Sequence, residues 1–153
     1  MTFGHIDRRA ATRDDEDFMR RLHHSAYRHV VEQQFGAWNE SQQDSFFADS
    51  FSVHPHEIIL ADGEPVGYCA IEEREDDIHL RELVVEPGAQ GRGVGTHILR
   101  DLQHLAQRTE KPIRLGVLIE NRAQLLYARL GFEAIGRTAT HVLMEWRVEL
   151  GPE

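Results

Sequence analysis

A glycine-rich segment, residues 88–95, stands where an apolar strand is expected to end and an amphipathic helix to begin. The backbone N–H groups at the start of a helix lack intrahelical partners and carry partial positive charge, so such a start attracts anions and above all phosphate. Gly93 and Gly95 would let the backbone approach a phosphate with no Cβ in the way. The segment therefore predicts a phosphate-binding loop.

Two common phosphate-binding loops fit this segment poorly. A P-loop requires lysine directly after its last glycine, whereas Thr96 follows Gly95. A dinucleotide fingerprint that starts at Gly91 would need its third glycine at Thr96. The acidic residue expected about twenty positions later should end the next strand, but Glu110 precedes that strand. Nucleotide binding of either kind is therefore disfavoured.

The run Gln-Gly-Arg-Gly-Val-Gly at 90–95 resembles the [QR]-x-x-G-x-[GA] loop of the GNAT superfamily of acetyltransferases, and Val85-Glu86-Pro87 resembles the strand end that precedes it. The resemblance implies that N–H groups of the loop hold the pyrophosphate of acetyl-CoA, and that the strand before it pairs with the pantetheine arm. A surface turn without a ligand is the alternative, and the flanking strand and helix argue against it. The cofactor-binding residues implied are Leu83, Val84, Val85, Gln90, Gly91, Arg92, Gly93, Val94, Gly95, Thr96, Asn121 and Tyr127.

A second stretch, with Asn121 and Ala123 followed by Tyr127-x-x-x-Gly131-Phe132, is similar to the other GNAT signature. The resemblance implies that Tyr127 is the catalytic acid, because a phenol with a pKa of about 10 can protonate the departing CoA thiolate. It also implies that Asn121 serves the cofactor while it caps a helix. Tyr127 shares a helix face with apolar residues, so its ring is expected to pack in the core while its hydroxyl points at the sulfur.

The general base is expected to be Glu82, just before the Leu-Val-Val run, where some relatives carry an acid. An ammonium must lose a proton before it attacks, and Glu82 would take that proton through water. The alternative is a solvated strand carboxylate or an ion pair with Arg81. Glu32 and His79 are weaker candidates for this role.

The acceptor is expected to meet two helices in the first third of the chain, because in GNAT proteins the helices after the first strand form much of the acceptor wall. Tyr27 and Trp38 would flank the acceptor, and Glu32 would bind its ammonium group. Helix packing for the aromatic residues and solvation for Glu32 form the alternative interpretation.

The elements that must position these residues follow from hydrophobic periodicity and turn residues. Their order is strand, two helices, three strands, helix, strand, helix, strand, which indicates a mixed α/β protein. The resemblance implies the GNAT fold, a mixed and mostly antiparallel central sheet flanked by helices, with splayed strands that form the acetyl-CoA cleft. The length of 153 residues indicates a single N-acetyltransferase domain over 1–153.

Three details of this assignment can be tested. Ser41 and Asp44 are predicted to open the second helix as a capping box. Asp62-Gly63 is predicted to turn a hairpin. One strand over residues 140–148 is predicted to close the fold. The expected segments are strands at 6–11, 57–61, 66–72, 78–85, 113–117 and 140–148, with helices beginning near residues 14, 41, 94 and 122.

Composition excludes several classes of protein. A net charge of −9 argues against nucleic-acid binding and mildly favours cationic acceptors. No apolar run could span a membrane, and the N-terminus does not resemble a secretion signal, so a cytoplasmic protein is expected. The ten histidines, including the pairs His54/His56 and His97/His104, lack metal-ligand spacing, so no metal is expected.

The expected reaction is direct transfer of an acetyl group from acetyl-CoA to a primary amine of a small molecule or peptide, in a ternary complex. No convincing nucleophile for an acetyl-enzyme is visible, since Cys69 lies in a strand run typical of a core thiol. The rivals are a non-catalytic acyl-CoA-binding module and a protein or peptide N-acetyltransferase. Homodimers are common in the family, but the sequence does not decide this point.

Overall fold

The computed structural model describes residues 3–148. Its strands form a seven-stranded sheet in the order β1-β2-β3-β4-β5-β7-β6. The chain divides into two compact units, one formed by residues 1–71 with 82–95 and the other by residues 72–81 with 96–153. The elements are β1 (Ile6–Ala10), α1 (Glu16–Phe35), α2 (Glu40–Val53), β2 (Glu57–Ala61), β3 (Glu64–Glu73), β4 (Ile78–Val85), α3 (Val94–Thr109), β5 (Ile113–Leu118), α4 (Ala123–Arg129), β6 (Glu133–Arg137) and β7 (His141–Trp146), with short 3₁₀ turns η1 (Arg13–Asp15) and η2 (Pro87–Ala89).

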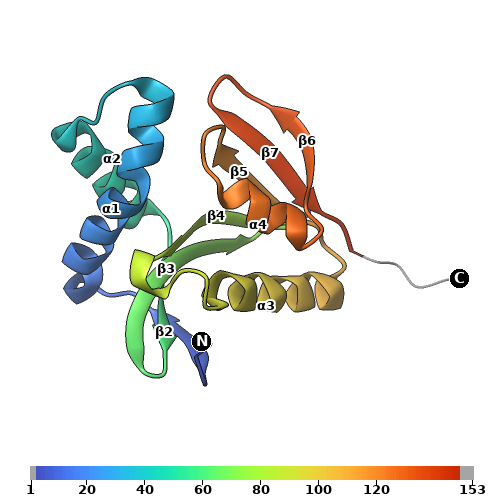
Figure 1. Ribbon diagram of the computed structural model, residues 1–153. Helices are drawn as coiled ribbons and strands as arrows, with labels where there is room; N and C mark the ends of the chain where they lie inside the picture. The colour runs from blue at the N-terminus through green and yellow to red at the C-terminus, as the bar shows by residue number, and fades with distance from the viewer. Residues whose placement is uncertain (1–2, 149–153) are drawn as a thin grey trace, which may run out of the picture. The chain divides into compact units, whose positions relative to one another are not determined.

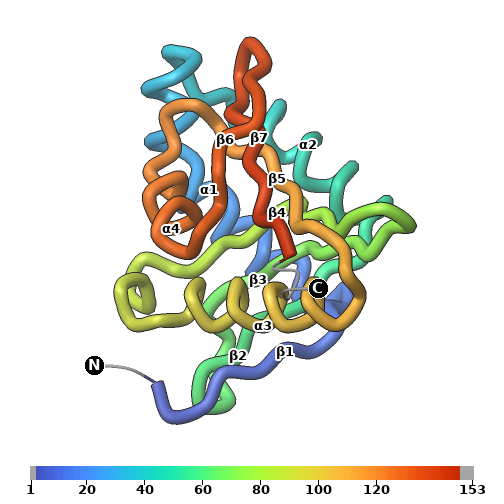
Figure 2. The backbone as a smooth tube through the Cα atoms, turned by 90° about the vertical axis from the view of Figure 1, so that its right-hand side faces the viewer, coloured from blue at the N-terminus to red at the C-terminus, as the bar shows by residue number. Residues whose placement is uncertain are grey.

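The first unit starts with an antiparallel ladder in which β1 pairs with β2 and β2 pairs with β3. The strands β1 and β2 lie side by side in both views (Figures 1 and 2). Asp62 and Gly63 both have positive φ, 49° and 86°, as a two-residue hairpin turn of the predicted kind requires. The predicted hairpin is therefore confirmed.

Helices α1 and α2 of this unit pack around a core that includes Met19, Phe47, Ile58 and Tyr68. Met19 and Tyr68 are completely buried, and the rings of Phe47 and Tyr68 meet edge to face at a centroid distance of 6.4 Å. This burial fixes α1 against β2 and β3. Helix α1 ends at Gly36, whose φ of 89° needs the freedom of glycine.

Helix α2 begins earlier than predicted, and the capping box assigned to Ser41 and Asp44 is wrong. Asn39 is the N-cap, in extended conformation, and its side chain accepts a hydrogen bond from Gln42 N–H at 2.9 Å. Asp44 instead bonds His24, with 2.6 Å between Nε2 and Oδ1. An asparagine that already satisfies a free N–H of the first turn leaves no role for a second cap two residues later.

The second unit holds α3, β5, α4, β6 and β7, with β7 antiparallel to both β5 and β6 (Figure 1). The start of β4 also belongs to it and pairs in parallel with β5 at Ile78↔Ile113 and His79↔Arg114. The ladder stops after these two pairs, so Leu83–Val85 lie outside it. Helix α3 buries Ile98, Leu99, Leu102 and Ala106, whose spacing places them on one face of the helix.

The closing strand predicted over 140–148 is present as β7, which is shorter and stops at Trp146, but the strand β6 that pairs with it was not predicted. All five residues of β6 are exposed, so the strand has no alternation of apolar and polar residues to reveal it. A register shift between Ala134 and Gly136 interrupts its pairing with β7. The remaining arrangement confirms a mixed α/β fold. Within residues 3–148, no helix is both long enough and apolar enough to cross a membrane.

Candidate functional site

The predicted phosphate-binding loop connects β4 to α3 in the first unit. Gly91 and Gly93 have φ angles of 75° and 88°, in the left-handed region that side chains disfavour. A Cβ built at either position would meet nothing within 4 Å, so the two glycines are required by backbone conformation and not by crowding. Buried Ala89 and Val94 anchor the two ends of the loop.

Gln90 supports the loop from within. Its side-chain amide donates to the carbonyl of Val85 at 2.9 Å, which ties the loop to the last residue of β4. Gly67 of β3, which sequence reasoning did not single out, adds a second constraint. A Cβ there would lie 2.3 Å from the carbonyl oxygen of Val84, so only glycine permits the approach of β3 to the end of β4.

The start of α3 is electrostatically suited to an anion. Its first turn has no acidic residue, so the partial positive charge of the helix terminus is not neutralised there. Arg92 of the loop lies over the Phe3 ring, 3.9 Å from the ring centroid, and adds a positive charge beside the glycines. Gln90, Arg92 and the glycines therefore fit the pyrophosphate that the sequence predicts here.

Glu82 lies beside Tyr68 in the first unit. Burial raises the pKa of the Glu82 carboxyl, and the Tyr68 hydroxyl opposes this by favouring the charged form. Burial, the Glu82 carboxylate and the nearby Tyr27 raise the pKa of Tyr68. Neither the Tyr68 hydroxyl nor Glu82 Oε2 has a hydrogen-bond partner within the described residues, although the two groups influence each other. Tyr68 was missed because its place in an apolar strand is typical of a core residue.

The predicted acceptor-binding residues have different environments. Tyr27 packs on the core and on His23, with 4.8 Å between ring centroids. Glu32 is exposed and forms an ion pair with Arg28 at 3.3 Å, in which Arg28 donates. Trp38 donates from Nε1 to Glu40 at 2.6 Å, and its ring meets His24 edge to face. Of the three, Tyr27 is the one that lies near Tyr68, the neighbour of Glu82.

Tyr127 belongs to α4 in the second unit and is buried, with its ring 5.7 Å from that of Phe132. Burial raises its pKa to about 12, so the phenol keeps its proton at physiological pH. The N–H of Phe132 returns to the Tyr127 carbonyl at 3.0 Å. Gly131 makes this turn possible with a φ of 95°. A rigidly held, protonated phenol is the form that a general acid requires.

Asn121 holds the start of α4. Its side-chain oxygen accepts from Ala123 N–H at 2.9 Å, and its own N–H donates to Leu118 at 2.9 Å. The predicted capping contact is therefore present, one residue before the formal N-cap, Arg122. Gln124 reinforces the turn by donating to the Ile119 carbonyl at 2.7 Å.

Other reactive side chains are accounted for by local packing. Cys69 is fully buried, and burial raises its pKa to about 12, so it stays a neutral thiol. Within residues 3–148, His24, Glu40 and Asp44 form the one group with spacing suited to a metal. The hydrogen bond between His24 and Asp44 already satisfies the facing atoms without an ion.

The sequence profile of the acetyltransferase (GNAT) domain matches residues 42–134. The chain belongs to the GNAT acetyltransferase family. An uncharacterised N-acetyltransferase of Methanocaldococcus jannaschii is 26% identical over 144 residues, which cover 82% of this chain and 59% of the relative. The chain thus matches little more than half the length of this GNAT relative.

Solved GNAT structures share the fold. The PaiA N-acetyltransferase of Thermoplasma acidophilum, solved with coenzyme A, superimposes with a TM-score of 0.72 at 15% identity, over 94% of this chain and 99% of that chain. A Salmonella typhimurium protein solved with its cofactor acetyl-CoA gives a TM-score of 0.61 at 20% identity, over 97% and 96% of the two chains. These similarities confirm the GNAT fold predicted from the sequence.

Proposed function

We propose that this GNAT domain transfers the acetyl group of acetyl-CoA directly to a primary amine, with Glu82 as general base and Tyr127 as general acid. The loop at the start of α3 is the observation that carries the proposal. Two left-handed glycines, a glutamine tied to the end of β4 and a first turn without acidic residues suit an anion such as a pyrophosphate. Residues 90–96 and Asn121 would hold acetyl-CoA, with the backbone of Leu83–Val85 pairing with its pantetheine arm.

Glu82 is suited to remove a proton from the acceptor. An ammonium cannot attack, and a carboxylate whose pKa is raised by burial accepts a proton more readily than an exposed one. The Tyr68 hydroxyl lies beside it and favours the charged form. The nitrogen of the neutral amine then attacks the thioester carbonyl, a C–N bond forms and the C–S bond breaks. The nitrogen loses its second proton as the amide forms, and this proton restores the Tyr127 hydroxyl after it has protonated the sulfur.

Tyr127 supplies the proton that the leaving sulfur needs. Its pKa of about 12 keeps the hydroxyl protonated over the whole range in which an enzyme works. Tyr27 and Trp38 are proposed to contact the acceptor, with Glu32 as a surface charge that attracts its ammonium group. No acetyl-enzyme is needed, because the thiol of Cys69 is buried and neutral.

The test is release of free thiol from acetyl-CoA in the presence of a panel of primary amines. Wild type should turn over at least one amine, and Tyr127→Phe should bind acetyl-CoA equally well but react slowly. Equal rates for wild type and Tyr127→Phe would remove Tyr127 from the mechanism. Tight acetyl-CoA binding with no turnover of any small amine or N-terminal peptide would instead support the non-catalytic module.

A further inference from the structure

The segment before β1 is fixed to the hairpin of β2 and β3 by Asp62. The Asp62 carboxylate accepts hydrogen bonds from His5 N–H at 2.7 Å and from Gly4 N–H at 3.2 Å. The N–H of Asp62 in turn donates to the His5 carbonyl at 2.8 Å. A Cβ on Gly4 would lie only 3.2 Å from Asp62 Oδ1, so the glycine permits this close approach. These bonds therefore hold residues 4 and 5 on the turn of the hairpin.

Phe3 directly precedes this fixed segment, and its ring contacts the predicted phosphate-binding loop. The guanidinium carbon of Arg92 lies 3.9 Å from the centroid of the Phe3 ring. A cation within about 6 Å of the face of an aromatic ring is attracted by the quadrupole of the ring. Phe3, Asp62 and Arg92 all belong to the first unit. The contact thus joins the start of the chain to the loop that is expected to hold a pyrophosphate.

The neighbours of Arg92 along the chain give its side chain little support. Arg92 stands between Gly91 and Gly93, whose φ angles are 75° and 88°. Neither glycine has a side chain to pack against the arginine, and the space where a Cβ would lie is open at both positions. The direction of the Arg92 side chain therefore depends on the contacts that this side chain itself makes.

A contact with an aromatic ring can orient an arginine without using its hydrogen-bond donors. The attraction acts on the charge of the guanidinium, whereas the N–H groups donate in the plane of that group. A mobile arginine side chain loses rotamer freedom when it binds a ligand, and a side chain that is already oriented loses less. The Phe3 ring therefore makes the binding of an anion by Arg92 more favourable.

We propose that Phe3, held in place by Asp62, is a positioning residue that orients Arg92 toward the pyrophosphate of bound acetyl-CoA. This role rests on the proposed function, in which the loop holds that pyrophosphate. The alternative is a packing contact that only fastens the N-terminal segment to the fold. A positioning residue acts on cofactor affinity through Arg92, whereas a packing contact does not.

The test is calorimetric titration of CoA into wild type, Phe3→Leu, Arg92→Gln and the double variant. Phe3→Leu keeps an apolar side chain of similar size but removes the aromatic face, so it should weaken CoA binding by about two- to fivefold. Phe3→Tyr keeps the ring and should bind CoA as tightly as wild type. In the Arg92→Gln background, Phe3→Leu should have no further effect, because the contact has already been removed.

Three further measurements sharpen this test. Asp62→Asn cannot accept both N–H groups in the same way, and the loss of CoA affinity that it causes should also vanish in the Arg92→Gln background. Phe46→Leu, which alters an exposed ring of α2 in the same unit, is the matched control and should leave CoA affinity unchanged. Dephospho-CoA keeps the pyrophosphate but lacks the 3′-phosphate, and its binding should depend on Phe3 as that of CoA does.

Unchanged CoA affinity in folded Phe3→Leu, or an equal loss with and without Arg92, would overturn the inference. Equal losses in Phe3→Tyr and Phe3→Leu would also overturn it, since the aromatic face would then have no part in binding. A dependence on Phe3 that disappears with dephospho-CoA would contradict the assignment to the pyrophosphate. Failure of wild type to bind CoA would contradict the proposed function itself, whereas normal binding without dependence on Phe3 would contradict only the positioning role.

Discussion

The hydroxyl of Tyr68 lies beside the carboxyl of Glu82 in the interior of the first unit, and neither the hydroxyl nor Glu82 Oε2 is satisfied by another described residue. A buried unpaired carboxyl lowers stability and is retained where chemistry requires it. Burial raises the pKa of the Glu82 carboxyl and makes it a stronger base, and the Tyr68 hydroxyl opposes this rise by favouring the charged form. This pair is the structural basis for assigning proton removal to Glu82.

Replacing Glu82 by Gln should lower kcat/KM by about 10²–10³-fold, because a positioned general base typically contributes that much. Activity of wild type should rise with pH through the raised pKa of Glu82, and the variant should lack this rise. The measurement is the pH profile of thiol release. Glu75→Gln, in an exposed turn, serves as the control.

The same replacement should increase stability at neutral pH. The folded pKa of Glu82 lies above its ordinary value of 4.5, so its contribution to stability is greatest below that pH and is lost as pH rises through the folded pKa. In thermal unfolding, the melting temperature of Glu82→Gln should rise relative to that of wild type from pH 5 to pH 8. A parallel loss of stability and activity would instead mark Glu82 as a structural residue.

Replacing Tyr68 by Phe should shift the acidic limb of the activity profile to higher pH. The hydroxyl lowers the pKa of Glu82, so its removal leaves burial unopposed. The ring stays in place, so the free energy of unfolding should change by about 1 kcal/mol or less, as is typical for the loss of one hydroxyl group. An unchanged pH profile would show that the two groups are not coupled.

Replacing Tyr127 by Phe should lower kcat by about 10–10³-fold with little effect on the affinity for acetyl-CoA. The pKa of about 12 predicts that loss of the Tyr127 proton causes no fall in wild-type activity up to about pH 10. Single-turnover rates with a thioester of a more acidic thiol provide the control. That leaving group needs less protonation, so the difference between the two proteins should shrink.

Replacing Asp15 by Asn should destabilise the first unit by about 1 kcal/mol at neutral pH. Arg9 donates to both oxygens of Asp15, at 2.8 and 2.9 Å, and Thr12 N–H donates at 2.9 Å. These bonds lower the pKa of Asp15 from 3.8 to about 2. The stabilisation is therefore present above about pH 4 and is lost as pH falls toward 2. In acid unfolding monitored by circular dichroism, wild type should lose this stability between pH 4 and pH 2, whereas Asp15→Asn should not.

Elements with strong local signals were predictable from the sequence. The Asp62-Gly63 turn and α3 have conformational or periodic requirements that few other sequences meet. Strand β6 was missed because all five residues are exposed, so its stability comes from pairing with β7 and not from its own pattern. The start of α2 was misplaced because Asn39 and Ser41 are both good caps, and only tertiary geometry selects between them.

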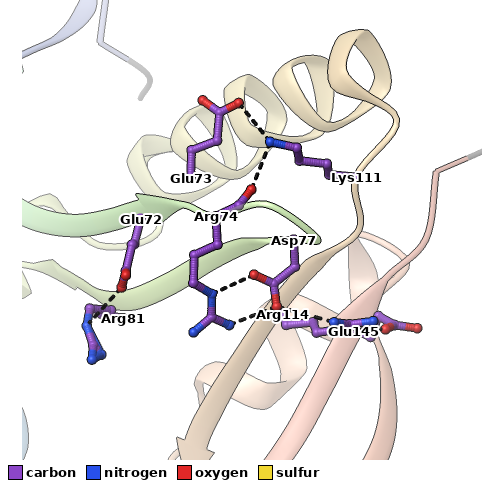
Figure 3. Close-up of polar contacts among 8 residues, drawn as sticks. All are labelled: Glu72, Glu73, Arg74, Asp77, Arg81, Lys111, Arg114 and Glu145. Carbon is purple, nitrogen blue, oxygen red and sulfur yellow. Dashed lines mark hydrogen bonds and ion pairs between the residues drawn. The ribbon is translucent and has the colours of Figure 1, made fainter.

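Some residues of the candidate site were likewise predictable from the sequence, and others were not. The loop and Tyr127 are marked by glycines and by spacing along the chain. Tyr68 and Gly67 are not, since a tyrosine and a glycine in an apolar strand acquire meaning only from the residues of β4 beside them. Arg114 donates to Asp77 at 3.3 Å (Figure 3), and this contact joins residues 37 positions apart, so no local pattern in the sequence could predict it.

Calorimetric titration of acetyl-CoA into wild type, Gly93→Glu and Gly63→Glu tests whether the glycine-rich loop binds the cofactor. Gly93 and Gly63 have nearly the same φ, 88° and 86°, and open space around them, so the two variants carry the same strain and the same added charge. Wild type and Gly63→Glu should bind acetyl-CoA, whereas folded Gly93→Glu should bind at least about a hundredfold more weakly. Equal binding by all three proteins, or no binding by folded wild type, would contradict the assignment of the loop.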